Sequence, residues 1–181
     1  MLKISTQAGR KWTAITFAGV AGPILIAGSM PICGIRINTS YSLPMGIYVR
    51  TTDPRAALIE FCPEGRFAVE SSRRGYRTRG FCPDGAVPLV KPAIAQPGDT
   101  VEVSAAGIAV NGRLLPQTAP VAKDRLGRTL EPWPVGRYTA SEGTVWVASS
   151  YNRGSYDSRY MGAIPTRLIR SRLRPLWTFQ R

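Results

Sequence analysis

The sequence predicts a mainly β protein: one antiparallel β domain preceded by a single membrane-spanning helix. Residues 12–33 form an uncharged, largely apolar run of 22 residues, which at ~1.5 Å per residue is long enough for the ~30 Å core of a bilayer. After residue 34 the apolar runs are short and are separated by Gly, Pro and Asn, a pattern typical of strands joined by turns. With 181 residues, 44% of them hydrophobic and 19% charged, the chain has the composition of a globular protein with one main domain.

The N-terminal segment predicts the orientation of the helix. Residues 1–11 carry three positive charges and no negative one, so we expect a basic cytoplasmic N-terminus and residues 34–181 on the other side of the membrane. A spanning anchor over residues 12–33 is the preferred interpretation. The alternatives are a cleaved secretory signal, since the small residues 27–29 lie near the end of the run, and a buried core helix.

The remaining elements are predicted in chain order. Apolar runs that predict strands lie at residues 47–52, 57–61, 86–91, 100–104, 107–112 and 144–149. Between the fourth and fifth runs, residues 104–107 predict a hairpin turn, and Asn111-Gly112 predicts the next turn. Residues 117–143 are rich in Pro, Gly and charge and predict a surface excursion.

Helical periodicity is not evident before the end of the chain. Residues 167–179 mix Arg with apolar side chains, which favours a solvated helix or strand face. An anionic membrane face or nucleic acid is the alternative partner of this segment.

The charged residues exclude whole classes of enzyme. The chain has a net charge of +13, 24 Lys and Arg of which only four are Lys, and no His. Without an imidazole, neither a Ser-His-Asp nor a Cys-His nucleophile can be built, and most catalytic zinc sites are disfavoured.

Two of the three cysteines stand in nearly identical contexts. Cys62 and Cys82 each follow Phe and precede Pro, an acid and Gly. The spacing excludes a zinc-type C-x-x-C site, so a Cys62–Cys82 disulfide in an oxidising compartment is favoured, with two buried free thiols as the alternative. The enclosed segment, residues 63–81, contains several Arg side chains whose repulsion predicts an open loop.

Without histidine, Lys91 is the candidate general base. It lies in the apolar stretch of residues 86–95, which disfavours the ammonium form and lowers the lysine pKa. A neutral amine can take a proton from a serine hydroxyl. The alternative is a lysine at a strand edge that reaches water.

Ser42 is the candidate nucleophile. Pro44 fixes its own φ and Gly46 permits unusual dihedral angles, so residues 38–48 form a shaped turn that leads into a strand. An ordinary turn whose serines cap backbone groups is the alternative.

Together these segments resemble the S26 signal peptidase family, and most closely its conjugative-transfer branch, the TraF-type peptidases. The segments, in the family's order, are NTSYSLPMGIY at 38–48, Lys91 followed by QPGDTV at 96–101, VNG at 110–112 followed by Pro116, and SYDSRYMG at 155–162. Common signal peptidases have S-M-x-P at the nucleophile and G-D-N-R before the last box. This chain has SLP at 42–44 and SSYN at 149–152, and both differences favour the TraF-type branch.

The resemblance implies a role for each matching residue. Ser42 is the implied nucleophile and Lys91 the general base, while Ser40 and the backbone N–H of Ser42 form the oxyanion hole. Ser155 orients the lysine amine. Asp157 matches an acidic residue on which TraF-type enzymes depend, although with Arg159 it could equally form a structural ion pair. No metal and no organic cofactor is implied.

The resemblance also implies a function. The expected enzyme is anchored in the bacterial inner membrane with its catalytic domain in the periplasm, and it matures the pilin precursor of a conjugative type IV secretion system. In this branch the acyl-enzyme is implied to be resolved by the pilin's own N-terminal amine, which gives a circular subunit. Other conjugative transfer proteins are possible partners, and nucleic acid is not expected.

Two alternatives remain. One is plain signal-peptide or C-terminal peptide hydrolysis of exported precursors. The other is a non-enzymatic pilus-assembly or DNA-contacting module, to which the net charge of +10 over residues 34–181 (21 basic minus 11 acidic residues) would point.

Overall fold

The structure, a computed structural model, describes residues 34–179. The predicted cytoplasmic segment 1–11 and spanning segment 12–33 lie outside the described residues. Within residues 34–179, no helix has the length and apolar character needed to cross a bilayer.

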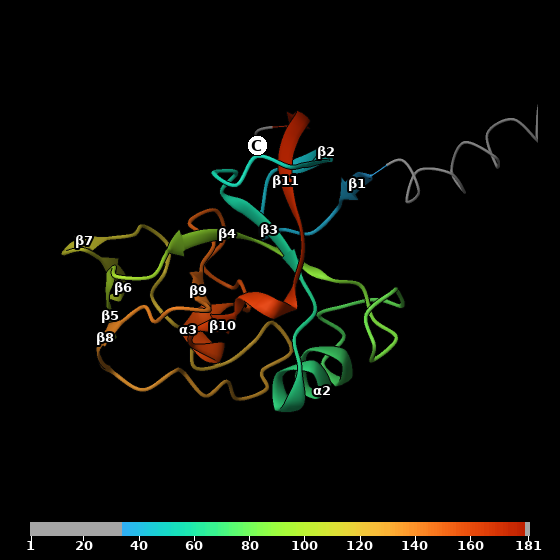
Figure 1. Ribbon diagram of the computed structural model, residues 1–181. Coiled ribbons are helices and arrows are strands. Elements are labelled where there is room, and N and C mark those ends of the chain that lie inside the picture. Colours follow the sequence, from blue (N-terminus) through green and yellow to red (C-terminus); the bar gives the residue numbers. More distant parts are fainter. Residues whose placement is uncertain (1–33, 180–181) are drawn as a thin grey trace, which may run out of the picture. The chain divides into compact units, whose positions relative to one another are not determined.

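The described part is mainly β, as predicted, and its strands form two antiparallel sheets (Figure 1). The first has the order β1-β2-β11-β3-β4-β9-β10 and the second the order β7-β6-β5-β8. The strands are β1 Ile35–Asn38, β2 Met45–Thr51, β3 Leu58–Phe61, β4 Leu89–Ala95, β5 Thr100–Ser104, β6 Gly107–Val110, β7 Arg113–Leu114, β8 Gly136–Thr139, β9 Thr144–Val147, β10 Ile164–Pro165 and β11 Ile169–Phe179. Three short helical segments, α2 Gly65–Arg73, α3 Ser158–Met161 and the 3₁₀ turn Thr166–Leu168, complete the described elements.

The Arg-rich tail is a strand inside the large sheet. The first half of β11 pairs with β3 and most of its length pairs with β2. Its Leu173 side chain is buried, whereas Leu176, Trp177 and Phe179 are exposed. Of the two forms predicted for this segment, the strand is the one found.

Gly46 allows β2 and β11 to pair closely. It has φ 153°, and a Cβ at this position would run into the carbonyl oxygen of Trp177 on β11. Only glycine fits this backbone approach without a shift of one strand. The close pairing of β2 with β11 therefore explains why a glycine stands next to the candidate nucleophile turn.

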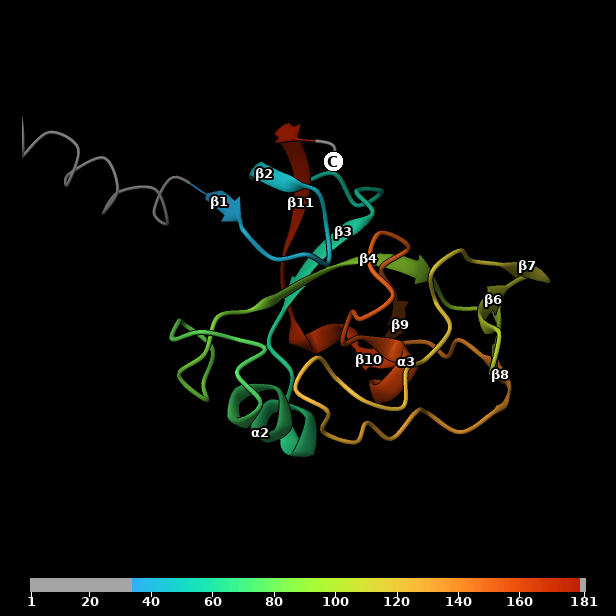
Figure 2. The same ribbon diagram turned by 180° about the vertical axis from the view of Figure 1, so that it is seen from behind.

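Two apolar clusters meet at β9. Val145 and Val147 point into the core beside Ile59 and Phe61 of β3, while Trp146 between them belongs to the cluster of the second sheet. This alternation is what a strand buried on both faces produces. The second sheet and α2 lie on opposite sides of β9, β10 and α3, which Figure 2 shows from behind.

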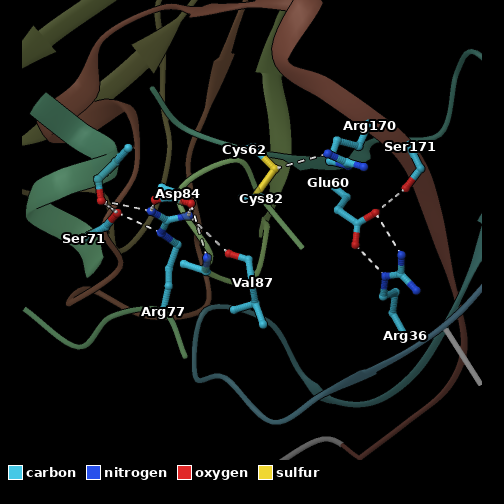
Figure 3. The surroundings of a disulfide bond; sticks show 12 residues. Arg36, Glu60, Cys62, Ser71, Arg77, Cys82, Asp84, Val87, Arg170 and Ser171 are labelled. Atoms are coloured by element: carbon cyan, nitrogen blue, oxygen red, sulfur yellow. Dashed lines mark hydrogen bonds and ion pairs between the residues drawn. A yellow bond between two sulfur atoms is a disulfide. The ribbon is translucent and has the colours of Figure 1, made fainter. Parts of the chain in front are cut away.

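The structure corrects the prediction for the loop enclosed by the two cysteines. Residues 65–73 form the helix α2, which buries Ala68 and Ser71. Arg77, one of the arginines expected to hold the loop open, is buried and forms an ion pair with Asp84, while its Nε donates to Ser71 Oγ at 2.9 Å (Figure 3). The position of the Arg77 side chain is therefore set by its ion pair with Asp84, not by repulsion from the other arginines.

The predicted disulfide between Cys62 and Cys82 is confirmed, with the two Cα atoms 5.6 Å apart (Figure 3). It joins the end of β3 to the turn before β4. The disulfide therefore closes the segment that carries α2.

The surface excursion over residues 117–143 is mostly irregular, as predicted, but it is not wholly on the surface. Thr118 and Leu130 are buried. The Thr118 hydroxyl accepts a hydrogen bond from Ile108 N at 2.9 Å. Residues 136–139 form β8, which pairs with β5.

Candidate active site

Ser42 lies in the turn between β1 and β2, and Asn38 organises that turn. The Asn38 amide nitrogen donates to the carbonyls of Ser40, Leu43 and Pro44 at 3.1–3.3 Å. Its side-chain oxygen accepts from the backbone N–H of Ser40 at 3.1 Å. The Leu43 side chain is buried. The turn is therefore held in two ways, by the hydrogen bonds of Asn38 to its backbone and by the burial of Leu43.

Lys91 comes to Ser42 from the interior of the sheet. It lies on β4, opposite Ile59 of β3, and only 3% of it is exposed. Its Nζ lies 2.5 Å from Ser42 Oγ and 2.8 Å from Ser155 Oγ. The two serine hydroxyls are themselves 3.3 Å apart, so the three side chains form one hydrogen-bonded cluster.

Burial lowers the pKa of Lys91 from 10.5 to about 8. Loss of hydration is the largest cause, the charge of Asp157 opposes it, and the charge of Arg159 adds to it. Near pH 8 about half of the molecules therefore carry a neutral amine with a free lone pair within hydrogen-bond distance of a serine hydroxyl.

Asp157 and Arg159 form a buried ion pair behind this cluster. Asp157 is the N-cap of α3, and both of its carboxylate oxygens accept from the Arg159 guanidinium at 2.8 Å. Arg159 also donates to backbone carbonyls of the surrounding loops, from Nη1 to Gln117 and Arg153 and from Nη2 to Ser149 and Asn152. The structure thus places Asp157 in an ion pair at the loop that carries Ser155.

Ser40 is exposed, and its hydroxyl donates to Asn38 Oδ1 at 2.7 Å. It lies in the same turn as Ser42. To donate to an oxyanion, this hydroxyl would have to rotate away from Asn38.

Sequence reasoning missed two residues of the site. Asn38 begins the nucleophile segment, but nothing in its sequence context indicated that one side chain would hold three carbonyls of the turn. Ser149 is fully buried, and its Oγ donates to the backbone carbonyl of Ser42 at 2.5 Å. It stands six residues before Ser155 and begins the SSYN segment noted above, but nothing there indicated a contact with Ser42.

A largely apolar cavity of about 440 Å³ borders the nucleophile turn. Its lining includes Leu43, Pro92, Ile94, Leu115, Ala148 and Tyr151. Such a cavity suits an apolar side chain of a peptide. In the part of the chain that the structure describes, no three His, Cys, Asp or Glu side chains group closely enough to hold a metal ion.

Comparison with known proteins decides the family. The family model of signal peptidases, peptidase S26, matches residues 47–177. The chain belongs to this family. The matched part of this S26 protein contains Lys91, Ser155 and Asp157.

Individual relatives of this S26 protein carry names from conjugation. It is 35% identical to the plasmid transfer protein TraF of Escherichia coli over 91% of its own length and 94% of that protein. It is 34% identical to the conjugal transfer protein TraF of Agrobacterium fabrum over 93% and 98% of the two chains. These relatives confirm the predicted TraF-type branch.

Among solved structures, a signal peptidase I from Enterococcus faecalis is 18% identical, with a TM-score of 0.38 and coverage of 69% of this chain and 99% of that chain. That likeness is too low to bear on the site.

Proposed function

We propose that this protein is a serine endopeptidase in which Ser42 is the nucleophile and Lys91 the general base. One observation carries the proposal: a buried amine, with its pKa lowered to about 8, lies 2.5 Å from the hydroxyl of Ser42. A nucleophile and a base within hydrogen-bond reach, with a third group orienting the base, is the arrangement that covalent catalysis requires. Ser155, 2.8 Å from the amine, is that third group.

In the first half of the reaction, the neutral Lys91 amine accepts the Ser42 proton while Oγ attacks the scissile carbonyl carbon. The resulting oxyanion is stabilised by the backbone N–H of Ser42 and by the Ser40 hydroxyl once it leaves Asn38. One such donor contributes roughly 10²–10³ in kcat. The Lys91 ammonium then gives its proton to the leaving nitrogen as the C–N bond breaks, and an ester on Ser42 remains.

In the second half, an incoming nucleophile resolves the ester. Lys91 takes a proton from that nucleophile, which attacks the ester carbonyl, and Ser42 Oγ leaves with a proton returned by Lys91. If the nucleophile is water, the product is a linear peptide. If it is the substrate's own N-terminal amine, the product is circular.

The proposed substrate is a conjugative pilin precursor, and the proposed location is the bacterial inner membrane with the catalytic domain in the periplasm. The relatives' names support the link to conjugation. The run over residues 12–33, the basic segment before it and the disulfide support the location. Other conjugative transfer proteins are the further partners we propose, and nucleic acid is not among them.

We propose cyclisation as the outcome for this substrate. An amine held in attack geometry reaches an effective molarity of ~10⁵ M or more, which exceeds the ~55 M of water. Ser42 stands about nine residues beyond the apolar run, so a membrane-embedded pilin could present both of its ends to the site.

Purified full-length protein incubated with the pilin precursor tests these proposals. We expect wild type and the exposed-serine control Ser141→Ala to process it, and Ser42→Ala and Lys91→Arg not to, because arginine keeps the charge but cannot act as a neutral base. Processing by Ser42→Ala would refute the nucleophile. A wild-type protein that cleaves nothing but binds DNA in a steeply salt-dependent way would favour the non-enzymatic alternative.

The mass of the product tests cyclisation separately. A circular subunit is about 18 Da lighter than the linear peptide of the same residues, because the closing amide retains no water. A product that is entirely linear would leave plain hydrolysis as the reaction.

A further inference from the structure

The hydroxyl of Ser149 connects the nucleophile to the interior of the protein. Ser149 follows β9 and is fully buried. Its Oγ donates to the backbone carbonyl of Ser42 at 2.5 Å. This contact joins residues 107 positions apart in the chain, and its acceptor is the backbone carbonyl of the proposed nucleophile residue.

The remaining hydrogen bonds of this hydroxyl direct its single proton to Ser42. The Ser149 oxygen accepts from the backbone N–H groups of Tyr151 at 3.1 Å and Asn152 at 3.3 Å. A serine hydroxyl has one proton and two lone pairs. Since both lone pairs are used, the proton is committed to the Ser42 carbonyl, and the two N–H groups strengthen that bond by polarising the hydroxyl.

The buried ion pair in turn holds the backbone of Ser149. Its N–H donates to Asp157 Oδ2 at 3.0 Å, and its carbonyl accepts from Arg159 Nη2 at 3.2 Å. A continuous chain of hydrogen bonds therefore runs from Asp157 and Arg159 through Ser149 to Ser42.

On the other side of Ser42, Asn38 holds the carbonyls of Leu43 and Pro44. Three successive carbonyls of the turn, those of residues 42–44, are thus fixed, the first by Ser149 and the other two by Asn38. The Tyr48 hydroxyl also donates to the Pro44 carbonyl, at 2.6 Å. Of these three side chains, Ser149 is the one that holds the carbonyl of the nucleophile itself.

We infer that Ser149 is a positioning residue for the nucleophile, through which the Asp157–Arg159 pair fixes the backbone that carries the Ser42 hydroxyl. This inference rests on the proposed peptidase function. Asp157 would then act on both halves of the site. The loop between β9 and α3 aligns Lys91 through Ser155, and it aligns Ser42 through Ser149. Ser149 does not contact the reacting atoms, so its effect is on alignment alone.

The test compares variants of the full-length protein on the pilin precursor. Ser149→Ala removes the hydroxyl, and Ser149→Cys keeps nearly the same size but offers only a weak donor. For both we expect kcat to fall by roughly 10- to 100-fold, the cost of a nucleophile that is poorly aligned. KM should change less than kcat, because Ser149, although it borders the apolar cavity, is fully buried and its hydroxyl proton is directed to the Ser42 carbonyl. Ser149→Thr keeps the hydroxyl and should recover most of the lost kcat.

The pH profile separates positioning from general damage. Ser149→Ala should keep the wild-type midpoint, because the contacts of Lys91 with Ser42 and Ser155 remain. Ser155→Ala, which removes a contact of Lys91 itself, should move the midpoint. Each rate is measured well below the unfolding temperature of its variant, with the exposed Ser141→Ala as the matched control.

Three results would overturn the inference: kcat of Ser149→Ala and Ser149→Cys within twofold of wild type, a shifted midpoint in either variant, or no recovery in Ser149→Thr. Ser42→Ala in the same assay keeps the two proposals apart. If Ser42→Ala is active, the proposed function fails. If wild type is active and Ser42→Ala is not, the Ser149 variants alone decide the inference.

Discussion

Replacement of Lys91 by Met should stabilise the fold at neutral pH while it removes the proposed base. The wild-type amine has a pKa lowered from 10.5 to about 8 by burial. At pH 7 the ammonium therefore costs the folded state about 3 kcal/mol relative to the unfolded state. Met keeps the aliphatic stem but loses two hydrogen bonds, about 1 kcal/mol each, so we expect a net gain of about 1 kcal/mol.

The sign of this difference should reverse at high pH. The unfolded state binds more protons than the folded state between pH 8 and pH 10.5, so wild-type stability rises with pH across this window. Between pH 7 and pH 10 the gain is about 2 kcal/mol. The Met variant lacks it and should be about 1 kcal/mol less stable than wild type at pH 10.

Denaturant unfolding of both proteins, followed by tryptophan fluorescence at pH 7 and pH 10, measures the effect. Lys123→Met, at an exposed lysine, is the control and should show no such dependence. A Lys91→Met variant that is less stable than wild type by the same amount at both pH values would refute the assigned pKa and, with it, the neutral amine on which the proposed mechanism depends.

Three further predictions follow from described contacts. The rate of precursor processing should rise to a plateau with a midpoint near pH 8, where the Lys91 amine becomes neutral; a flat profile from pH 6 to 9 would point to another base. The double variant Cys62→Ala/Cys82→Ala should lower the free energy of unfolding by roughly 3 kcal/mol, because it frees the segment of α2 in the unfolded state; an unchanged denaturation midpoint would contradict this. Burial raises the pKa of Glu60, but hydrogen bonds from Arg36 and Ser171 and the charges of Arg36 and Arg50 lower it below its usual range. Glu60→Gln should therefore destabilise the fold at pH 7 on the order of 3 kcal/mol. The difference should shrink as the pH falls below the ordinary glutamate range, and a constant difference down to pH 3 would be the contrary result.

The strands were predictable because their signals are local. Val101 and Val103 alternate with polar residues, and Asn111-Gly112 marks a turn. The two successive hairpins, β5 with β6 and β6 with β7, therefore follow from short stretches of sequence. The sequence of the tail did not distinguish a helix from a strand. Its strand lies inside the sheet and still exposes apolar side chains such as Trp177, so the tail lacks a clear alternation of buried and exposed residues.

The helix α2 was missed because its apolar contact with the core is narrow, with Phe67 partly buried against the main cluster. Of its nine residues, Ala68 and Ser71 are buried, so it lacks the wide apolar stripe that sequence reasoning looks for. The buried Arg77 adds a polar contact by donating to Ser71. A polar contact between a helix and a later loop is a tertiary feature that no local pattern contains.

The site was predicted unevenly for the same reason. The sequence segments around Ser42, Lys91 and Ser155 indicate their chemistry, and the structure brings the three side chains together. Ser149 and Asn38 act on the backbone of the nucleophile turn from positions 107 and four residues away along the chain. Such roles depend on which carbonyl each side chain reaches, and only the folded chain defines that.

Trapping of the acyl-enzyme would identify the nucleophile by a covalent bond. Full-length protein is mixed with excess pilin precursor near pH 8, quenched with acid within one turnover, digested and mapped by mass spectrometry. We expect an ester-linked fragment of the precursor on the peptide that contains Ser42, and no such fragment in Ser42→Ala or Lys91→Met. Processing of the precursor with the adduct on another residue, or undiminished processing by Ser42→Ala, would contradict it.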